Sequence, residues 1–83
     1  MQITNELGMH ARAATKFVQT ANKFSAVISV EKDGQSVNGK SIMGVLTLAA
    51  AKGAEILVVC DGEDAQAAME ALALIIENGF GEK

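Results

Sequence analysis

The 83-residue chain contains no proline, no tryptophan and no tyrosine, and it has one cysteine and one histidine. The single cysteine, Cys60, excludes an internal disulfide and a multi-cysteine zinc site, which suits a reducing compartment. Few basic residues, an acidic balance and the lack of Tyr and Trp argue against nucleic-acid binding. No apolar run is long enough to cross a bilayer, and no secretory signal stands at the N-terminus. We therefore expect one cytoplasmic domain, residues 1–83, without membrane insertion.

The formal net charge of −3 is unevenly distributed along the chain. Residues 1–53 carry six basic and three acidic side chains, whereas residues 54–83 carry seven acidic side chains and one basic side chain. If the fold keeps these regions on different faces, one face favours anions and the other repels them. An ordinary solvated surface also accounts for most of these charges.

Alternating and helical patterns of apolar residues predict seven secondary-structure elements. Strands are expected at residues 1–6, 24–30, 35–39 and 55–60, and helices at residues 11–22, 41–51 and 65–76. Four strands and three helices in so short a chain predict an α+β fold of the order βαββαβα. Its sheet should be antiparallel, with all helices on one face.

Residues 34–41, GQSVNGKS, match the P-loop pattern G-x-x-x-x-G-K-[ST] at every defined position. A working P-loop wraps a phosphate between a buried strand and a long helix, yet the residues before GKS alternate like a hairpin arm. Gly44 would weaken the helix. About fifty residues follow Gly34, less than half of an ordinary domain of about 100–150 residues. We interpret the match as accidental.

His10, the only histidine, lies at the expected start of the first helix, in the segment GMHAR. The first backbone N–H groups of a helix have no intrahelical partner, and the helix dipole is positive there. An anion near His10 would also find Arg12 as a clamp and Lys16 one turn later. The same field disfavours an imidazolium, and a neutral imidazole is the form that can attack phosphorus. These residues suit a reversible phosphoryl carrier rather than a kinase, and one histidine makes a poor metal site.

Three segments, LGMHARAATKFVQTANKF, VNGKSIMGVLTLAAAKG and DGEDAQAAMEAL, together resemble HPr, the histidine-containing phosphocarrier family of the bacterial phosphotransferase system. The resemblance covers nearly the whole chain. It implies an open-faced β-sandwich, with four antiparallel strands in the order 1-4-2-3 and three helices on one face. It also implies that phosphorylated enzyme I, supplied by phosphoenolpyruvate, donates a phosphoryl group to Nδ1 of His10. The group would then pass to a histidine of an enzyme IIA domain in sugar uptake or its regulation.

The resemblance also implies roles for other residues near His10 and in the segment GKSIMG. Arg12 matches the family's phosphate-contacting arginine, and the amides of Ala11 and Arg12 would face the phosphate. Ser41 matches a regulatory phosphorylation site of an ATP-dependent serine kinase/phosphorylase. A plain helix N-cap also explains a serine at this position.

A docking surface is expected beside the site. In SIMGVLTL, Val45 and Leu48 can face the core, which leaves Ile42, Met43 and Leu46 partly exposed. Exposed apolar residues next to a charged site are typical of a protein-docking patch, and methionine suits several partners. The complete expected docking set is Ala11, Lys16, Ile42, Met43 and Leu46.

Two other functions stay open on the sequence alone. One is a regulatory protein of the nitrogen-related phosphotransferase branch that acts mainly by protein–protein contacts or through Ser41, although such a protein has no need of the His10–Arg12 pair. The other is a small nucleotide-binding enzyme, which saturable, magnesium-dependent ATP binding would support. The favoured prediction is a monomeric carrier, without a cofactor, that forms a phosphohistidine and is not itself an enzyme.

Overall fold

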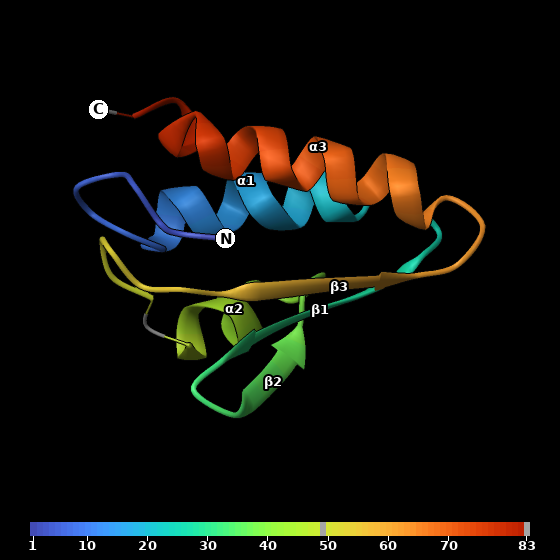
Figure 1. Cartoon of the computed structure of the whole chain (residues 1–83), viewed down its shortest axis with the longest axis horizontal. Helices are drawn as coiled ribbons and strands as arrows, with labels where there is room; N and C mark the ends of the chain where they lie inside the picture. Colours follow the sequence, from blue (N-terminus) through green and yellow to red (C-terminus); the bar gives the residue numbers. More distant parts are fainter. Residues whose placement is uncertain (49, 83) are drawn as a thin grey trace.

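The computed structural model describes residues 1–48 and 50–82 (Figure 1). Helices α1 and α3 lie side by side on one side of the sheet, and α2 packs against α1 and β2. The elements in chain order are α1 (Ala11–Ala21), β1 (Val27–Lys32), β2 (Gln35–Asn38), α2 (Ile42–Thr47), β3 (Leu57–Asp61), α3 (Ala65–Glu77) and a 3-10 turn, η1 (Gly79–Gly81).

The sheet differs from the expected four strands in the order 1-4-2-3. In the described part of the chain it has three antiparallel strands in the order β2-β1-β3. The N-terminal segment, expected as a strand over residues 1–6, forms only an isolated antiparallel bridge between Gln2 and Glu55. Its backbone pairing ends after Ile3, because the chain then turns and the Gly8 N–H donates to the Asn5 carbonyl at 3.1 Å. The paired segment is therefore too short to form a regular strand.

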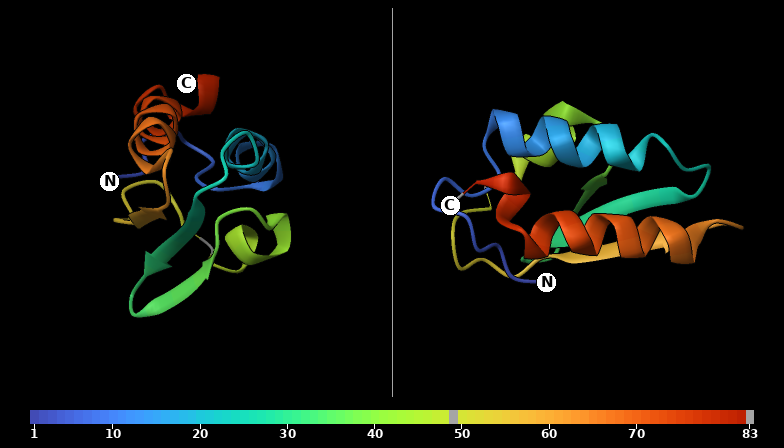
Figure 2. Two further views of the ribbon diagram at one scale, coloured as in Figure 1. Left: turned by 90° about the vertical axis from the view of Figure 1, so that its right-hand side faces the viewer. Right: turned by 90° about the horizontal axis from the view of Figure 1, so that it is seen from above.

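The two faces of the sheet differ in exposure, as the alternating sequence predicts. Ile28, Val30 and Val58 are buried under the helices, whereas Val27 and Leu57 are exposed on the opposite face. The end-on view in Figure 2 shows all three helices on one side of the sheet, which leaves the other side open. The α+β class and the open face of the sandwich agree with the prediction.

The turn between β1 and β2 contains the first glycine of the apparent P-loop, Gly34. Asp33 and Gly34 both have positive φ, 52° and 83°, as a two-residue type I′ turn requires. Residues 35–38 are strand β2, and Lys32 pairs with Gln35 directly across the turn. The segment is thus a hairpin arm and not a phosphate-wrapping loop, which agrees with the interpretation of the motif as accidental.

Helix α2 is shorter than the expected 41–51. It begins after Ser41, whose hydroxyl accepts the Gly44 N–H at 3.1 Å, and it ends at Thr47. Val45 and Leu48 face the core, as expected. The predicted helix also included residue 49, which lies outside the described residues.

Candidate functional site

His10 is the N-cap residue of α1. Its backbone is extended, with φ −83° and ψ −178°, and its Nδ1 accepts the Arg12 backbone N–H at 3.4 Å. The backbone before it is fixed at two points: the Met9 N–H donates to the Ala50 carbonyl at 2.7 Å, and the His10 N–H donates to the Gly8 carbonyl at 2.9 Å. A histidine predicted from sequence to start the helix is therefore its cap, with Nδ1 at the positive end of the helix.

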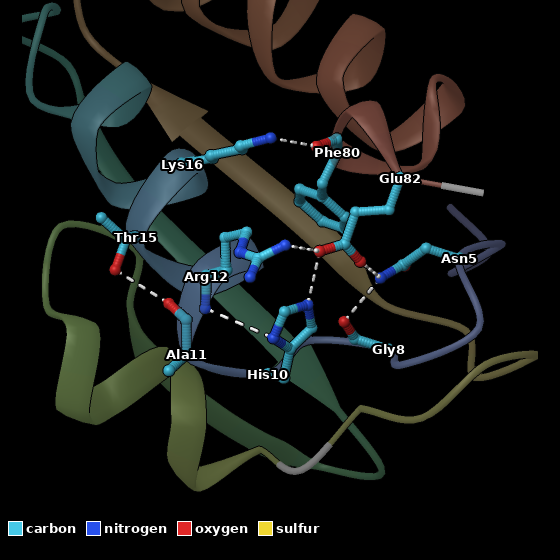
Figure 3. A network of polar contacts seen from close by, with 9 residues as sticks. All are labelled: Asn5, Gly8, His10, Ala11, Arg12, Thr15, Lys16, Phe80 and Glu82. Atoms are coloured by element: carbon cyan, nitrogen blue, oxygen red, sulfur yellow. Dashed lines mark hydrogen bonds and ion pairs between the residues drawn. The ribbon is translucent and has the colours of Figure 1, made fainter.

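The other ring nitrogen of His10 meets a carboxylate that the sequence analysis did not identify. His10 Nε2 lies 2.7 Å from Oε2 of Glu82, which is 72 residues away in the chain. The second oxygen of this carboxylate, Oε1, accepts a 2.9 Å hydrogen bond from Nδ2 of Asn5. In Figure 3 the N-terminal and C-terminal segments bring Asn5 and Glu82 to the same side of the imidazole ring.

The hydrogen bonds decide which nitrogen of His10 carries the proton when the ring is neutral. An ionised carboxylate can only accept, so Nε2 must donate to Glu82. Nδ1 accepts from the Arg12 amide and so presents its lone pair toward the N-terminus of α1. The ring therefore has its nucleophilic nitrogen at the end of the helix that attracts anions.

Glu82 is itself held in the ionised form. The hydrogen bond from Asn5 lowers the pKa of the Glu82 carboxyl from its ordinary value. The hydrogen bond with His10 and the nearby Arg12 charge lower it further. Partial burial of the side chain acts in the opposite direction but does not prevail. The acceptor facing His10 is therefore an anion over the neutral pH range.

The two basic residues expected near His10 are in different situations. The Arg12 side chain is 73% exposed, and its Nη1 lies 4.0 Å from Glu82 Oε2, a contact at the limit of an ion pair. The Lys16 ammonium donates a 2.6 Å hydrogen bond to the Phe80 carbonyl and so ties α1 to η1. Arg12 is thus free to turn toward an anion at Nδ1, whereas Lys16 is bonded to the C-terminal turn.

The predicted docking residues lie on α1 and α2, which pack against each other. Met43 is 77% exposed and Ile42 is 40% exposed, while Leu46 is half-buried against the core. Ala11 is exposed at the first position of α1. The structure thus leaves the first turn of α2 open, next to the capping serine.

Other candidate chemistry is absent from the described residues. No group of three or more His, Cys, Asp or Glu side chains in residues 1–48 and 50–82 could hold a metal ion. Burial, with a further contribution from the Asp64 charge, raises the pKa of the Cys60 thiol, so it is not an activated nucleophile. Within the same residues, no helix is both long and apolar enough to cross a membrane.

Asn5 and Glu82 are the residues around His10 that the sequence analysis missed. Asn5 stands in the segment ITNELG, where a polar residue in an expected short strand suggests nothing beyond an exposed position. In the structure Asn5 is only 1% exposed. For Glu82, near the end of an acidic segment, no local signal points to His10, because only the fold brings them together.

Comparison with known proteins supports the resemblance found in the sequence. Residues 1–78 match the family described as "PTS HPr component phosphorylation site". Phosphocarrier protein HPr of Xylella fastidiosa strain Temecula1 is 50% identical over 82 residues, covering 99% of this chain and 92% of that protein. Two crystal structures of HPr from Thermoanaerobacter tengcongensis are also similar. One, described as HPr-C-His, has a TM-score of 0.97 and 47% identity over 100% of this chain and 93% of that one. The other, described as an HPr dimer, has a TM-score of 0.85 and 48% identity over 99% of this chain and 94% of that one.

Proposed function

The chain belongs to the HPr family of phosphotransferase-system phosphocarriers, and we propose that His10 carries the phosphoryl group on Nδ1. The observation that carries this proposal is the orientation of the ring: Nε2 is bonded to Glu82, and Nδ1 faces the N-terminus of α1. Members of this family are carriers that hold a phosphohistidine within a relay and are not enzymes with their own turnover.

Acceptance of the phosphoryl group follows from the neutral ring. The Nδ1 lone pair attacks phosphorus, the Nδ1–P bond forms, and the bond from phosphorus to the donor's leaving atom breaks. Nε2 keeps its proton, so the phosphorylated ring carries positive charge beside the Glu82 carboxylate. The new phosphoryl oxygens lie at the helix end, within reach of the exposed Arg12 guanidinium as a clamp. Donation to the next partner is the same step in reverse, from His10 to another histidine.

The partners we propose are enzyme I as donor and enzyme IIA domains as acceptors. The exposed apolar side chains Ile42 and Met43, with half-buried Leu46, form the centre of the docking patch, and Ala11 and Lys16 extend it along α1. Such a patch excludes water around the phosphoryl group, and enzyme I and an enzyme IIA domain can bind to it one after the other. We place these exchanges in the cytoplasm, where phosphoenolpyruvate is available to enzyme I.

Ser41 is proposed as a regulatory phosphorylation site for a serine kinase/phosphorylase. Its hydroxyl caps α2 and lies immediately before the exposed Ile42 and Met43. A phosphate here would add negative charge at the edge of the docking patch while meeting the favourable end of a helix. The regulatory effect would therefore act on partner binding rather than on the fold.

The first experiment compares the wild type with His10→Asn after incubation with enzyme I, phosphoenolpyruvate and magnesium. Asparagine retains the N-cap acceptor of α1 and removes the nucleophile, so a loss of labelling would not reflect loss of the helix. Intact masses before and after mild acid should show one acid-labile phosphate on the wild type and none on the variant. An unmodified wild type, with an established carrier labelled in parallel, would refute the carrier proposal and favour the regulatory protein.

We also propose that the carrier acts as a monomer. Three of the similar structures are described as dimers, so the proposal needs its own measurement. Sedimentation at several protein concentrations should give the mass of one 8.6 kDa chain throughout, and a concentration-dependent rise toward twice that mass would refute it.

A further inference from the structure

We infer that Glu82 is a positioning residue for His10 and that Asn5 holds the Glu82 carboxylate in place. The inference rests on the proposed role of His10 and extends it to the residues that set the tautomer and direction of its ring. Its basis is the chain of hydrogen bonds from Gly8 through Asn5 and Glu82 to His10 (Figure 3).

The C-terminal turn holds Glu82 firmly over the histidine. The Glu82 backbone N–H donates to the Gly79 carbonyl at 2.9 Å, and Phe80 is buried in the core at 2% exposure. The Lys16 ammonium fixes the Phe80 carbonyl from α1. With its own side chain only 13% exposed, Glu82 lacks the freedom of an ordinary surface carboxylate.

The orientation of the Asn5 amide is determined by its surroundings. Nδ2 donates both to the Gly8 carbonyl at 2.8 Å and to Glu82 Oε1 at 2.9 Å. The reversed amide would place an oxygen against these two acceptors, which is repulsive. Asn5 is almost fully buried, and its Oδ1 has no hydrogen-bond partner among the described residues. A buried amide with an unpaired oxygen costs stability, so a role in orienting Glu82 accounts for an asparagine that packing alone does not favour.

A carboxylate is the side chain that this position requires. Each of its oxygens faces a donor: Oε1 faces Asn5 Nδ2, and Oε2 faces the His10 Nε2–H. A glutamine in the same place offers one acceptor and one donor. Either Asn5 then loses its acceptor, or the glutamine NH₂ faces His10 and favours the tautomer with the proton on Nδ1. That tautomer has no lone pair on Nδ1 with which to attack phosphorus.

The carboxylate also stabilises the product of the transfer. When the Nδ1–P bond forms, no proton leaves the ring, and the positive charge that develops is shared with Nε2–H. Glu82 lies 2.7 Å from that nitrogen, on the side of the ring away from Nδ1, so it stabilises the cation without facing the phosphoryl oxygens directly.

The test is Glu82→Gln, with Glu77→Gln as the matched control, because Glu77 is an exposed carboxylate on α3. Nitrogen NMR of the unphosphorylated protein, at a pH where the ring is neutral, should show the proton on Nε2 in the wild type and in the control. In Glu82→Gln a substantial fraction should carry it on Nδ1. The rate of phosphoryl acceptance from phosphorylated enzyme I should fall about tenfold, by analogy with the low end of the effect seen when carboxylate partners of metal-binding histidines are removed.

A second variant tests whether Asn5 holds the Glu82 carboxylate in place. Asn5→Leu keeps the number and branching of the side-chain heavy atoms and removes the amide donor, so Glu82 should lose its fixed position and the tautomer should shift in the same direction by a smaller amount. An unchanged tautomer in Glu82→Gln, or a changed tautomer with an unchanged rate, would overturn the inference. The NMR measurement needs no phosphorylation, and so failure of this inference is distinguishable from failure of the carrier proposal, in which the wild type itself acquires no acid-labile phosphate.

Discussion

Gly8 should be among the least replaceable residues of the site, and Gly8→Ala tests how the loop before His10 is held. Gly8 has φ +65°, in the left-handed region. A Cβ placed there would lie 2.5 Å from the Ala50 carbonyl oxygen and 2.8 Å from the Ala51 Cα. Both obstacles are backbone atoms, which cannot move aside as a flexible side chain can.

The expected destabilisation has two parts. Forcing a residue with a Cβ into left-handed geometry costs roughly 1–2 kcal/mol, and the overlap with backbone adds about 1–3 kcal/mol. The sum, about 2–5 kcal/mol, is a large share of the roughly 4–12 kcal/mol expected for a chain of this size. Gly34→Ala is the matched control, because Gly34 also has positive φ, 83°, but a Cβ there would meet nothing within 4 Å. It should cost only the conformational part, about 1–2 kcal/mol.

Urea unfolding followed by far-UV circular dichroism measures both variants, since a chain without Trp or Tyr has little useful fluorescence. With a denaturant slope of about 1 kcal/mol/M, the midpoint should fall by about 2 M or more for Gly8→Ala and by about 1–2 M for Gly34→Ala. Any surviving folded Gly8→Ala protein should also accept phosphate slowly, because the Gly8 carbonyl anchors both the His10 N–H and Asn5. Equal midpoints for the two variants would refute the steric argument.

Three further predictions concern the cap of α2, the start of α3 and the docking patch. Ser41→Ala should lower the free energy of unfolding by about 1 kcal/mol, because the helix loses its cap. Ser41→Asp should keep the stability of the wild type but slow phosphoryl transfer to enzyme IIA. Equal stability of the two variants would contradict the capping role of Ser41. Hydrogen bonds from backbone amides, the one from Ser25 foremost, lower the pKa of the Asp64 carboxyl in the folded state. The folded state should therefore lose stability as the pH falls from about 4, the pKa of an unfolded aspartate, through the lowered pKa of Asp64. Asp64→Asn should flatten this part of the pH profile of the urea midpoint, and an unaltered profile would contradict the assignment. Met43→Ser should weaken binding to enzyme I in calorimetry by about tenfold, whereas Leu74→Ser, on the exposed side of α3, should not; equal effects would count against the patch.

Local sequence patterns determined much of the fold. Helical spacing located the ends of α1 and α3 to within one residue, and alternation identified the buried faces of β1 and β3. The alternation of the residues before GKS indicated a hairpin arm, and the structure has its turn at Asp33-Gly34, where both residues have positive φ. These features depend on residues that are neighbours in the chain, and so they can be predicted from the sequence.

Contacts between distant segments were less predictable. Asp64, directly before α3, accepts the backbone N–H groups of Ser25 and Ala26, 39 and 38 residues earlier. Lys16 was expected to face an anion near His10, and in the structure it is bonded to Phe80. In both cases nothing in the local sequence shows which segment packs beside the charged side chain.

The same distinction between local and long-range contacts applies to the candidate site. The segment GMHAR by itself determined that His10 lies at the start of a helix, with Arg12 beside it, because a helix terminus is a local structure. Only the tertiary structure decided that Glu82 and Asn5 fix the ring, since this requires the two ends of the chain to meet at α1. The direction of a side chain depends on hydrogen-bond partners that can come from any part of the chain, and folding, not sequence proximity, selects them.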